Sequence, residues 1–330
     1  MSKPLVLLTD PLPAAWISML DGKVRLETGD EGSAGFSLRL EKYFPEAHGI
    51  LSLLTAKIDS TRLQQMPQLR VVSNMAVGVD NIDVPACTRR RIPVGHTPDV
   101  LTDATADLTL AILLAAARRL SEAALDAKEG RWGTWSPTGW LGADLRGAQL
   151  GIVGMGKIGR AVAERARGFG VRLAYTNPSS VDTDAARMSL DELLQTSDFL
   201  SLHCPLNEST RGLIGERELK LMKKSAILVN AARGPVVDSD ALLRALTNGW
   251  INAAALDVTD PEPLPPGSPL YGLKNCLIVP HIGSATHGAR RRMAEIACEN
   301  LLAGLNGERL PDCVNPEVYN DESSLPLREG

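Results

Sequence analysis

A glycine-rich turn constrains the fold of this chain more than any other feature. Gly154-Met155-Gly156-Lys157-Ile158-Gly159 follows an apolar run at 149–153 and opens an amphipathic stretch that reaches about residue 168. Between a strand and a helix, G-x-G-x-x-G lets backbone N–H groups and the helix dipole meet a pyrophosphate. The motif therefore predicts a dinucleotide site formed by these six residues, with a tight structural turn as the alternative. Lys157 either adds charge to this site or is simply solvated.

Short apolar runs alternate with amphipathic stretches along the chain, as parallel strands alternate with helices. We expect strands at 5–8, 49–54, 71–75 and 92–94, and in a second series at 149–153, 171–175, 199–203, 226–231, 252–256 and 276–279. Helices are expected after the capping box Ser189 to Glu192, after the N-cap Asp238 and at 286–305. A length of 330 residues suits two domains. The predicted fold class is α/β, with two Rossmann-like or flavodoxin-like doubly wound parallel sheets and a cleft between them.

One long helix is predicted from an N-cap at Thr102-Asp103 to Glu129. Its middle, 108–117, is nearly all apolar, so we expect both domains or a second subunit to cover it. The loop at 132–140 then holds three of the five tryptophans, for core packing or for an interface or substrate pocket. The tail beyond Leu305 is expected to pack loosely or to fray.

Composition excludes several classes of function. The net charge of −4, without a clustered excess of Lys and Arg, argues against nucleic acid, and 290–292 is interpreted as a solvated basic face. The five scattered cysteines form neither a disulfide framework nor a zinc site, so we expect no metal and a reducing cytoplasm. The apolar run at 5–8 is too short for a signal peptide or a membrane span. We expect a cytoplasmic protein with no membrane partner.

Three polar side chains each follow a predicted strand, namely Arg233, Glu262 and His281. Carboxyl ends of parallel strands meet at the ligand-binding edge of a sheet, so the three are expected in one site. Reducing a 2-keto acid needs a cation for the carboxylate, a proton donor for the new alkoxide and a partner that keeps this donor protonated. These roles are assigned to Arg233, His281 and Glu262, while a cofactor carries the hydride. Taken one at a time, each of the three residues could also have a purely structural role. No chemistry is assigned to the other four histidines, His48, His96, His203 and His287.

The segment 175–180 decides between the two nicotinamide cofactors. NAD-binding sheets end this strand with a carboxylate, and NADP-binding ones place an Arg nearby. Neither stands in Tyr175-Thr-Asn-Pro-Ser-Ser180. Without a carboxylate, Thr176, Asn177, Ser179 and Ser180 can donate hydrogen bonds to a phosphate. We therefore predict a slight preference for NADP(H) over NAD(H), with a polar turn that accepts either as the alternative.

Together, the motifs G-x-G-K-I-G, N-A-A-R-G, D-V-x-x-x-E-P and P-H-I-G-S-A-T resemble the D-2-hydroxyacid dehydrogenase family, and within it the glyoxylate/hydroxypyruvate reductases. The resemblance implies a discontinuous substrate-binding domain at 1–99 and 288–330 and an NAD(P)-binding Rossmann domain at 100–287. It also implies a homodimer that reduces glyoxylate and hydroxypyruvate. Alternatives are a lactate- or phosphite-type dehydrogenase of the same fold, or an NAD(H)-sensing corepressor.

The resemblance further assigns individual site residues. Val77 and Gly78 would offer backbone amides to the substrate carboxylate, Leu54 would limit the pocket to short substrates, and Asp257 would face the nicotinamide carboxamide. Further substrate contacts are expected at Ser284 and Trp140. Further cofactor contacts are expected at Thr105, Cys204, Pro205, Ala231, Ala232, His281, Gly283 and Ser284. Two segments depart from the family pattern: 177–180 lacks the usual Arg, and the tryptophan of the loop stands one place later, at Trp140.

Overall fold

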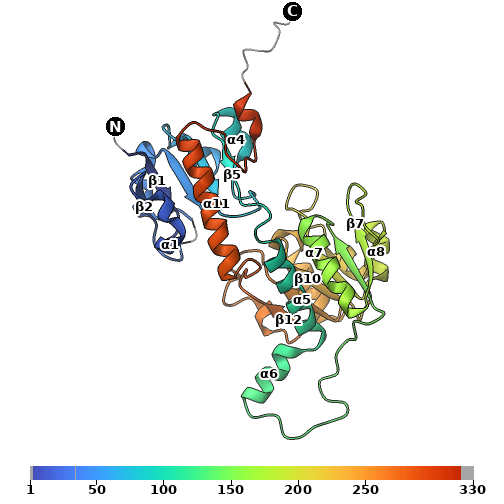
Figure 1. Ribbon diagram of the computed structural model, residues 1–330. Coiled ribbons are helices and arrows are strands. Elements are labelled where there is room, and N and C mark those ends of the chain that lie inside the picture. Colours follow the sequence, from blue (N-terminus) through green and yellow to red (C-terminus); the bar gives the residue numbers. More distant parts are fainter. Residues whose placement is uncertain (1–2, 34, 321–330) are drawn as a thin grey trace, which may run out of the picture. The chain divides into compact units, whose positions relative to one another are not determined.

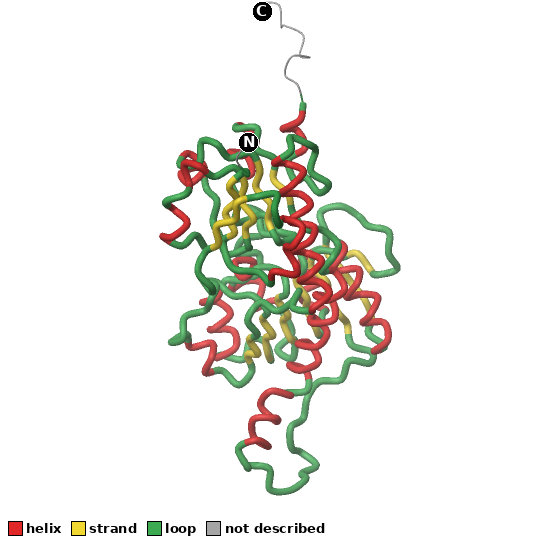
Figure 2. Tube along the Cα trace, turned by 60° about the vertical axis from the view of Figure 1, so that its left-hand side comes forward, coloured by secondary structure: helices red, strands yellow, loops and turns green. Residues whose placement is uncertain are grey.

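The computed structural model describes residues 3–33 and 35–320, and the chain divides into two units. The first unit joins the residues up to Val100 with those from Thr286 onward, and the second spans Leu101–Ala285. Each unit contains one parallel sheet accompanied by helices, as the strands and helices of Figure 2 show. The predicted fold class, two doubly wound parallel α/β sheets, is confirmed. Within the described ranges, no helix is long and apolar enough to cross a membrane.

The sheet of the first unit has the strand order β2-β1-β3-β4-β5, a flavodoxin-like arrangement. Its strands are β1 (Leu5–Leu8), β2 (Arg25–Thr28), β3 (Gly49–Ser52), β4 (Val71–Asn74) and β5 (Val94–Gly95). Its helices are α1 (Ala14–Ile17), α2 (Leu38–Glu41), α3 (Ser60–Gln64), α4 (Val84–Arg89) and α11 (His287–Leu305). Although α11 comes from the far end of the chain, it packs on β3 and β4 (Figure 1). Ser73 Oγ donates to Ala297 O at 2.7 Å, which ties the two segments together.

The sheet of the second unit has the order β12-β11-β10-β9-β6-β7-β8. Its strands are β6 (Gln149–Val153), β7 (Arg172–Thr176), β8 (Ala186–Arg187), β9 (Phe199–Leu202), β10 (Ile227–Asn230), β11 (Ala253–Leu256) and β12 (Cys276–Ile278). Its helices are α5 (Thr102–Ala117), α6 (Leu120–Lys128), α7 (Lys157–Ala166), α8 (Leu190–Thr196), α9 (Glu216–Leu221) and α10 (Ser239–Thr247). The strand order reverses between β6 and β9, and such a switch point is where doubly wound sheets bind ligands.

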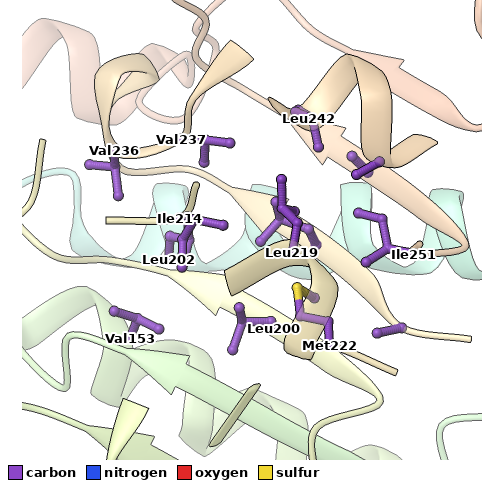
Figure 3. Close-up of a cluster of buried hydrophobic side chains, with 14 of the residues drawn as sticks. Val153, Leu200, Leu202, Ile214, Leu219, Met222, Val236, Val237, Leu242 and Ile251 are labelled. Atoms are coloured by element: carbon purple, nitrogen blue, oxygen red, sulfur yellow. The ribbon is translucent and has the colours of Figure 1, made fainter. Parts of the chain in front are cut away.

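Apolar side chains on both faces of this sheet explain why its strands are continuous apolar runs. Figure 3 shows one of the two clusters, in which Val153, Leu200 and Leu202 from the sheet pack with Leu219 and Leu242 from helices α9 and α10. On the other face, α5 and α7 cover the sheet. Each fully buried leucine contributes about 2 kcal/mol through the hydrophobic effect, so the strand ends that carry the site rest on a rigid layer.

The predicted single helix from Thr102 to Glu129 is wrong, because the chain forms α5 and α6 with Arg119 between them at φ 53°. A tertiary contact ends α5: Ala143 N donates to Ala117 O at 2.8 Å where the chain returns. The predicted N-cap is also wrong, since Leu101 precedes the helix without a capping side chain. The apolar face of α5 packs on α7 and on β10, β11 and β12 of its own unit.

The structure also differs from the predictions at the edge strands of both sheets and in the C-terminal tail. Strands β2 and β8 were not predicted, because Arg25-Leu-Glu-Thr28 and Ala186-Arg187 carry no apolar run. The tail was expected to pack loosely beyond Leu305, but Val314 N donates to Val94 O at 2.8 Å and the side chain of Asn315 is buried. This expectation is therefore wrong for 312–315, while 321–330 lie outside the described residues. The capping box at Ser189 and the N-cap at Asp238 are confirmed.

Candidate active site

The three glycines of the turn after β6, Gly154, Gly156 and Gly159, differ in how closely neighbouring atoms approach them. Gly154 has φ 96°, and a Cβ there would lie 2.6 Å from Cys204 N at the end of β9. A Cβ on Gly159 would collide with Gly154 O, whereas one on Gly156 would meet nothing within 4 Å. The first and third glycines thus permit close packing, and the second faces open space. Gly156 is the N-cap of α7, and no side chain caps this helix end in the described part of the chain, so the residues present fit a pyrophosphate.

The loop after β7 is tied to this turn. Asn177 Oδ1 accepts a hydrogen bond from Met155 N at 3.2 Å, and Asn177 Nδ2 donates to Ser179 O at 3.2 Å. Ser179 and Ser180 are exposed, and no carboxylate stands in 175–180. The pyrophosphate turn and the segment expected to meet the adenosine ribose therefore form one connected surface.

Asp257 organises the loop that follows β12. Its carboxylate accepts from Ile282 N at 2.6 Å and from Gly283 N at 2.9 Å, while its carbonyl oxygen accepts from His281 N at 2.8 Å. A Cβ on Gly283 would lie 2.9 Å from Asp257 Oδ2 and 3.4 Å from the Thr105 side chain. Burial raises the pKa of Asp257, although the two N–H donors partly oppose this shift. Predicted cofactor contacts Asp257, Thr105 and Gly283 thus lie together.

The predicted catalytic residues follow three neighbouring strands, β10, β11 and β12. Glu262 Oε1 lies 2.5 Å from His281 Nδ1, and Glu262 Oε2 accepts from Thr259 N at 3.2 Å. The side chains of His281 and Glu262 remain 24% and 32% exposed, so both are accessible to a ligand. A Cβ on Gly234 would collide with Thr259 O, and this close approach brings the Arg233 loop against the Glu262 loop.

Electrostatics couples the three residues. Burial raises the pKa of Glu262, but the hydrogen bond to His281, the charge of His281 and the charge of Arg233 lower it, and the net pKa is below the ordinary value. Glu262 is therefore a carboxylate at neutral pH. Because it engages Nδ1 of His281, proton exchange with a ligand falls to Nε2 of the same ring.

Asn230, which was not among the predicted site residues, shapes the Arg233 loop. Asn230, buried at the end of β10, accepts from Ala232 N at 3.0 Å and donates to Arg233 O at 2.9 Å. Arg233 Nη1 donates to Ala232 O at 2.8 Å. Ala231 is partly exposed and Ala232 is buried in this turn. A polar residue ending an otherwise apolar strand was the available signal for Asn230.

In the first unit, Val77 and Gly78 lie in a loop after β4. Neither backbone N–H donates to an acceptor within residues 3–33 and 35–320. Asn74 holds the loop by donating to Gly78 O at 3.0 Å, and Asn81 donates to Ala56 O at 2.9 Å. These two asparagines were not predicted. Leu54, shortly after β3, is partly exposed.

Other predicted contacts have different surroundings. Cys204 is buried beside the phosphate turn, Pro205 is exposed and Ser284 is half-buried. Trp140, 40% exposed, lies under the Arg119 guanidinium at 4.9 Å. It belongs to the segment that follows α6, and α6 and this segment extend away from the sheet of the second unit (Figure 1). No hydrogen bond or ring contact of the described residues joins Trp140 to the catalytic three. No group of three or more potential metal ligands occurs in the described ranges.

The fold and the strand-end site define a nicotinamide-dependent oxidoreductase, and comparisons with known proteins give its family. The model of the D-isomer specific 2-hydroxyacid dehydrogenase NAD binding domain matches residues 110–283. The chain is 45% identical to a glyoxylate reductase of Korarchaeum cryptofilum, over 96% of this chain and 97% of that protein. It belongs to the D-isomer specific 2-hydroxyacid dehydrogenase family, which confirms the predicted resemblance.

Solved structures with the same fold support this family assignment. A Thermus thermophilus protein has a TM-score of 0.88 at 46% identity, covering 94% of this chain and 99% of that chain. An NADPH-dependent glyoxylate/hydroxypyruvate reductase of Sinorhizobium meliloti, solved with NADP and malonate, has a TM-score of 0.85 at 28% identity, covering 97% of this chain and 99% of that chain.

Proposed function

We propose that this enzyme reduces glyoxylate to glycolate and hydroxypyruvate to D-glycerate, with NADPH preferred over NADH. The observation that carries the proposal is the His281–Glu262 pair, joined at 2.5 Å beside Arg233. The names of the relatives support it, since one is a glyoxylate reductase and another an NADPH-dependent glyoxylate/hydroxypyruvate reductase. The absence of a carboxylate from 175–180 supports NADPH.

Each of the three residues has one role in the proposed reaction. The bound nicotinamide supplies the hydride that reduces the keto carbon. Arg233 binds the substrate carboxylate through its planar guanidinium and orients the keto oxygen. His281 donates a proton from Nε2 to that oxygen, so the C=O becomes C–OH. Glu262 stabilises the imidazolium through Nδ1 and fixes the ring orientation.

The remaining predicted residues complete the proposal. The turn from Gly154 to Gly159 would hold the pyrophosphate, and Asp257 would accept from the nicotinamide carboxamide. The first unit would act as the substrate-binding domain, with the N–H groups of Val77 and Gly78 on the substrate carboxylate and Leu54 limiting substrate length. Additional contacts are proposed at Thr105, Cys204, Pro205, Ala231, Ala232, Gly283 and Ser284.

We also propose a homodimer formed through the segment that includes α6. Five large apolar side chains of this segment are exposed, namely Leu120, Leu125, Trp132, Trp135 and Leu141, and exposed apolar side chains that gather in one segment are typical of an interaction surface. Trp140 in this segment is proposed to reach the substrate of the partner subunit. The five cysteines are free thiols, as in proteins of a reducing cytoplasm, where we place the enzyme.

Turnover tests the proposal. NADPH and NADH should each be mixed with glyoxylate, hydroxypyruvate and pyruvate on one preparation, with loss of reduced-cofactor absorbance as the readout. We expect oxidation with the first two acids, faster with NADPH. Cofactor binding without oxidation by any of the acids would instead favour the NAD(H)-sensing alternative.

The proton-donor role is tested by His281→Ala. The variant is expected to lose about 10²- to 10⁴-fold in kcat, the usual contribution of a general acid, while NADPH binds as in the wild type. His287→Ala, at an exposed position to which no chemistry is assigned, is the matched control. Full activity in His281→Ala would disprove the role.

A further inference from the structure

A guanidinium from the edge strand β8 lies at the loop after β7. The two strands are parallel, and Tyr175 of β7 pairs with Arg187 of β8. This register brings Arg187 beside the loop although it stands ten residues after Asn177 in the sequence. Arg187 Nη2 donates to Asn177 O at 3.2 Å and to Pro178 O at 3.0 Å. Arg187 therefore lies against the loop that follows β7.

Most of the hydrogen-bonding capacity of Arg187 remains available. A guanidinium carries five N–H groups in a planar fork, and both of these bonds use Nη2. Among the described residues, no acceptor takes a hydrogen bond from its Nε or Nη1, and no carboxylate forms an ion pair with it. Its side chain is exposed. Arg187 thus presents an uncompensated charge and three N–H donors.

Two other arginines of the second unit form ion pairs with carboxylates, unlike Arg187 among the described residues. Arg167 forms an ion pair with Asp184, and Arg165 forms ion pairs with Asp103 and Asp107. Their charges are neutralised within the protein and are less available to an anion.

One further cation flanks the same loop. Arg160 of α7 donates from Nη1 to Asp182 O at 3.1 Å and, in the described part of the chain, has no carboxylate partner. The Asp182 side chain, the one carboxylate in 176–182, is exposed to solvent. Two guanidiniums from α7 and β8 therefore bracket a loop that carries a single acidic group, which favours an anion.

We propose that Arg187 recognises the 2′-phosphate of NADP(H), an inference that rests on the proposed function. In dinucleotide-binding sheets the adenosine ribose lies at the end of the second strand of the motif, which here is β7. The bond between Asn177 Oδ1 and Met155 N joins this loop to the pyrophosphate turn. Arg187 supplies a positive charge and the N–H groups of Nε and Nη1 for charge-assisted hydrogen bonds to a phosphate, and the exposed hydroxyls of Ser179 and Ser180 supply further donors.

A purely structural role predicts a different outcome. If Arg187 only held the carbonyls of 177 and 178, its loss would loosen the whole ribose site. Ligands with and without the 2′-phosphate would then be weakened equally. Recognition of the phosphate weakens only the ligand that carries it, so the ratio of the two affinities separates the roles.

The test measures binding of 2′,5′-ADP and of 5′-ADP by titration calorimetry, using the full chain. For Arg187→Gln we expect about a tenfold or greater loss of affinity for 2′,5′-ADP, as for one lost charge-assisted bond, and a change below about twofold for 5′-ADP. Arg187→Lys keeps the charge but lacks the Nε and Nη1 donors of the guanidinium, so its affinity for 2′,5′-ADP should fall between those of the wild type and Arg187→Gln. Arg172→Gln is the matched control, since Arg172 begins β7, is exposed, and its Nε donates to the backbone oxygen of Gly147 at 3.3 Å.

Two results would overturn the proposal: equal losses for both ligands, or an unchanged affinity for 2′,5′-ADP in Arg187→Gln. Calorimetry needs no turnover, so the outcome is independent of which acid the enzyme reduces. An enzyme that reduces glyoxylate but shows an unchanged ratio would refute the role of Arg187 alone. A protein inactive on every acid that still shows the selective loss would refute the proposed reaction and leave the phosphate site in place.

Discussion

Asp257 is predicted to act as the clamp that positions His281. Its carboxylate accepts from Ile282 N at 2.6 Å and Gly283 N at 2.9 Å, and the residue is only 2% exposed to solvent. In Asp257→Asn one oxygen becomes an NH₂ group that faces an N–H donor. One charge-assisted bond, contributing about 1.5–3 kcal/mol, is lost, and an unmatched buried N–H costs about 1–3 kcal/mol more. Burial disfavours the charged carboxylate and raises its pKa, which offsets part of this cost. We therefore expect the free energy of unfolding of Asp257→Asn to be about 3 kcal/mol lower than that of the wild type.

Two assays measure the effect of Asp257→Asn. Urea unfolding without cofactor measures the free energy of unfolding, and single-turnover reduction of glyoxylate measures the chemical step. Displacement of the proposed proton donor, His281, by about 1 Å costs on the order of 10²-fold in rate, and we expect Asp257→Asn to lower the single-turnover rate by this factor.

Asp238→Asn is the control for Asp257→Asn, because Asp238 accepts one backbone N–H, from Ala241 at 2.9 Å, at the exposed start of α10. It should lose at most about 1 kcal/mol of stability, with an unchanged single-turnover rate. Wild-type stability and rate in Asp257→Asn would refute the clamp. A loss of rate without a loss of stability would assign Asp257 to cofactor contact alone.

Three further predictions concern the same fold. Gly234→Ala forces a methyl group into Thr259 O, so we expect a loss of about 1–3 kcal/mol in urea unfolding and a fall in kcat/KM; wild-type values would show that the two loops can separate freely. Burial lowers the pKa of His203 to about 4 from 6.5, and the unfolded chain therefore binds more protons between these values. The stability that the neutral His203 contributes is full above the unfolded pKa of 6.5 and is lost as pH falls toward the folded pKa of about 4. The free energy of unfolding should fall by about 2 kcal/mol between about pH 7.5 and about pH 5. Urea unfolding of His203→Gln should show a smaller pH dependence, and a dependence identical to that of the wild type would contradict the assignment. Finally, light scattering after gel filtration should give a dimer, and Trp135→Ser with Leu141→Ser should shift it toward monomer; a wild-type monomer would rule out the proposed interface.

Much of the candidate site could be predicted from the sequence because its signals are local. The phosphate turn is six consecutive residues, and its strand and helix are both visible as apolar periodicity. Arg233, Glu262 and His281 each follow a strand closely, and parallel strands deliver their carboxyl ends to one edge. The contact between His281 and Glu262 follows from that topology, although their distance of 2.5 Å does not.

The sequence by itself determined the alternation of strands and helices, the glycine turn and the strand-end residues, since each depends on hydrophobic period or on glycine conformation within a few residues. Only the tertiary structure decided the break at Arg119, where the returning Ala143 takes a carbonyl of α5. It alone paired the polar edge strands and thereby brought Arg187 to the loop at Asn177. Edge strands and helix ends depend on hydrogen bonds between distant segments, and no local periodicity records which segments will meet.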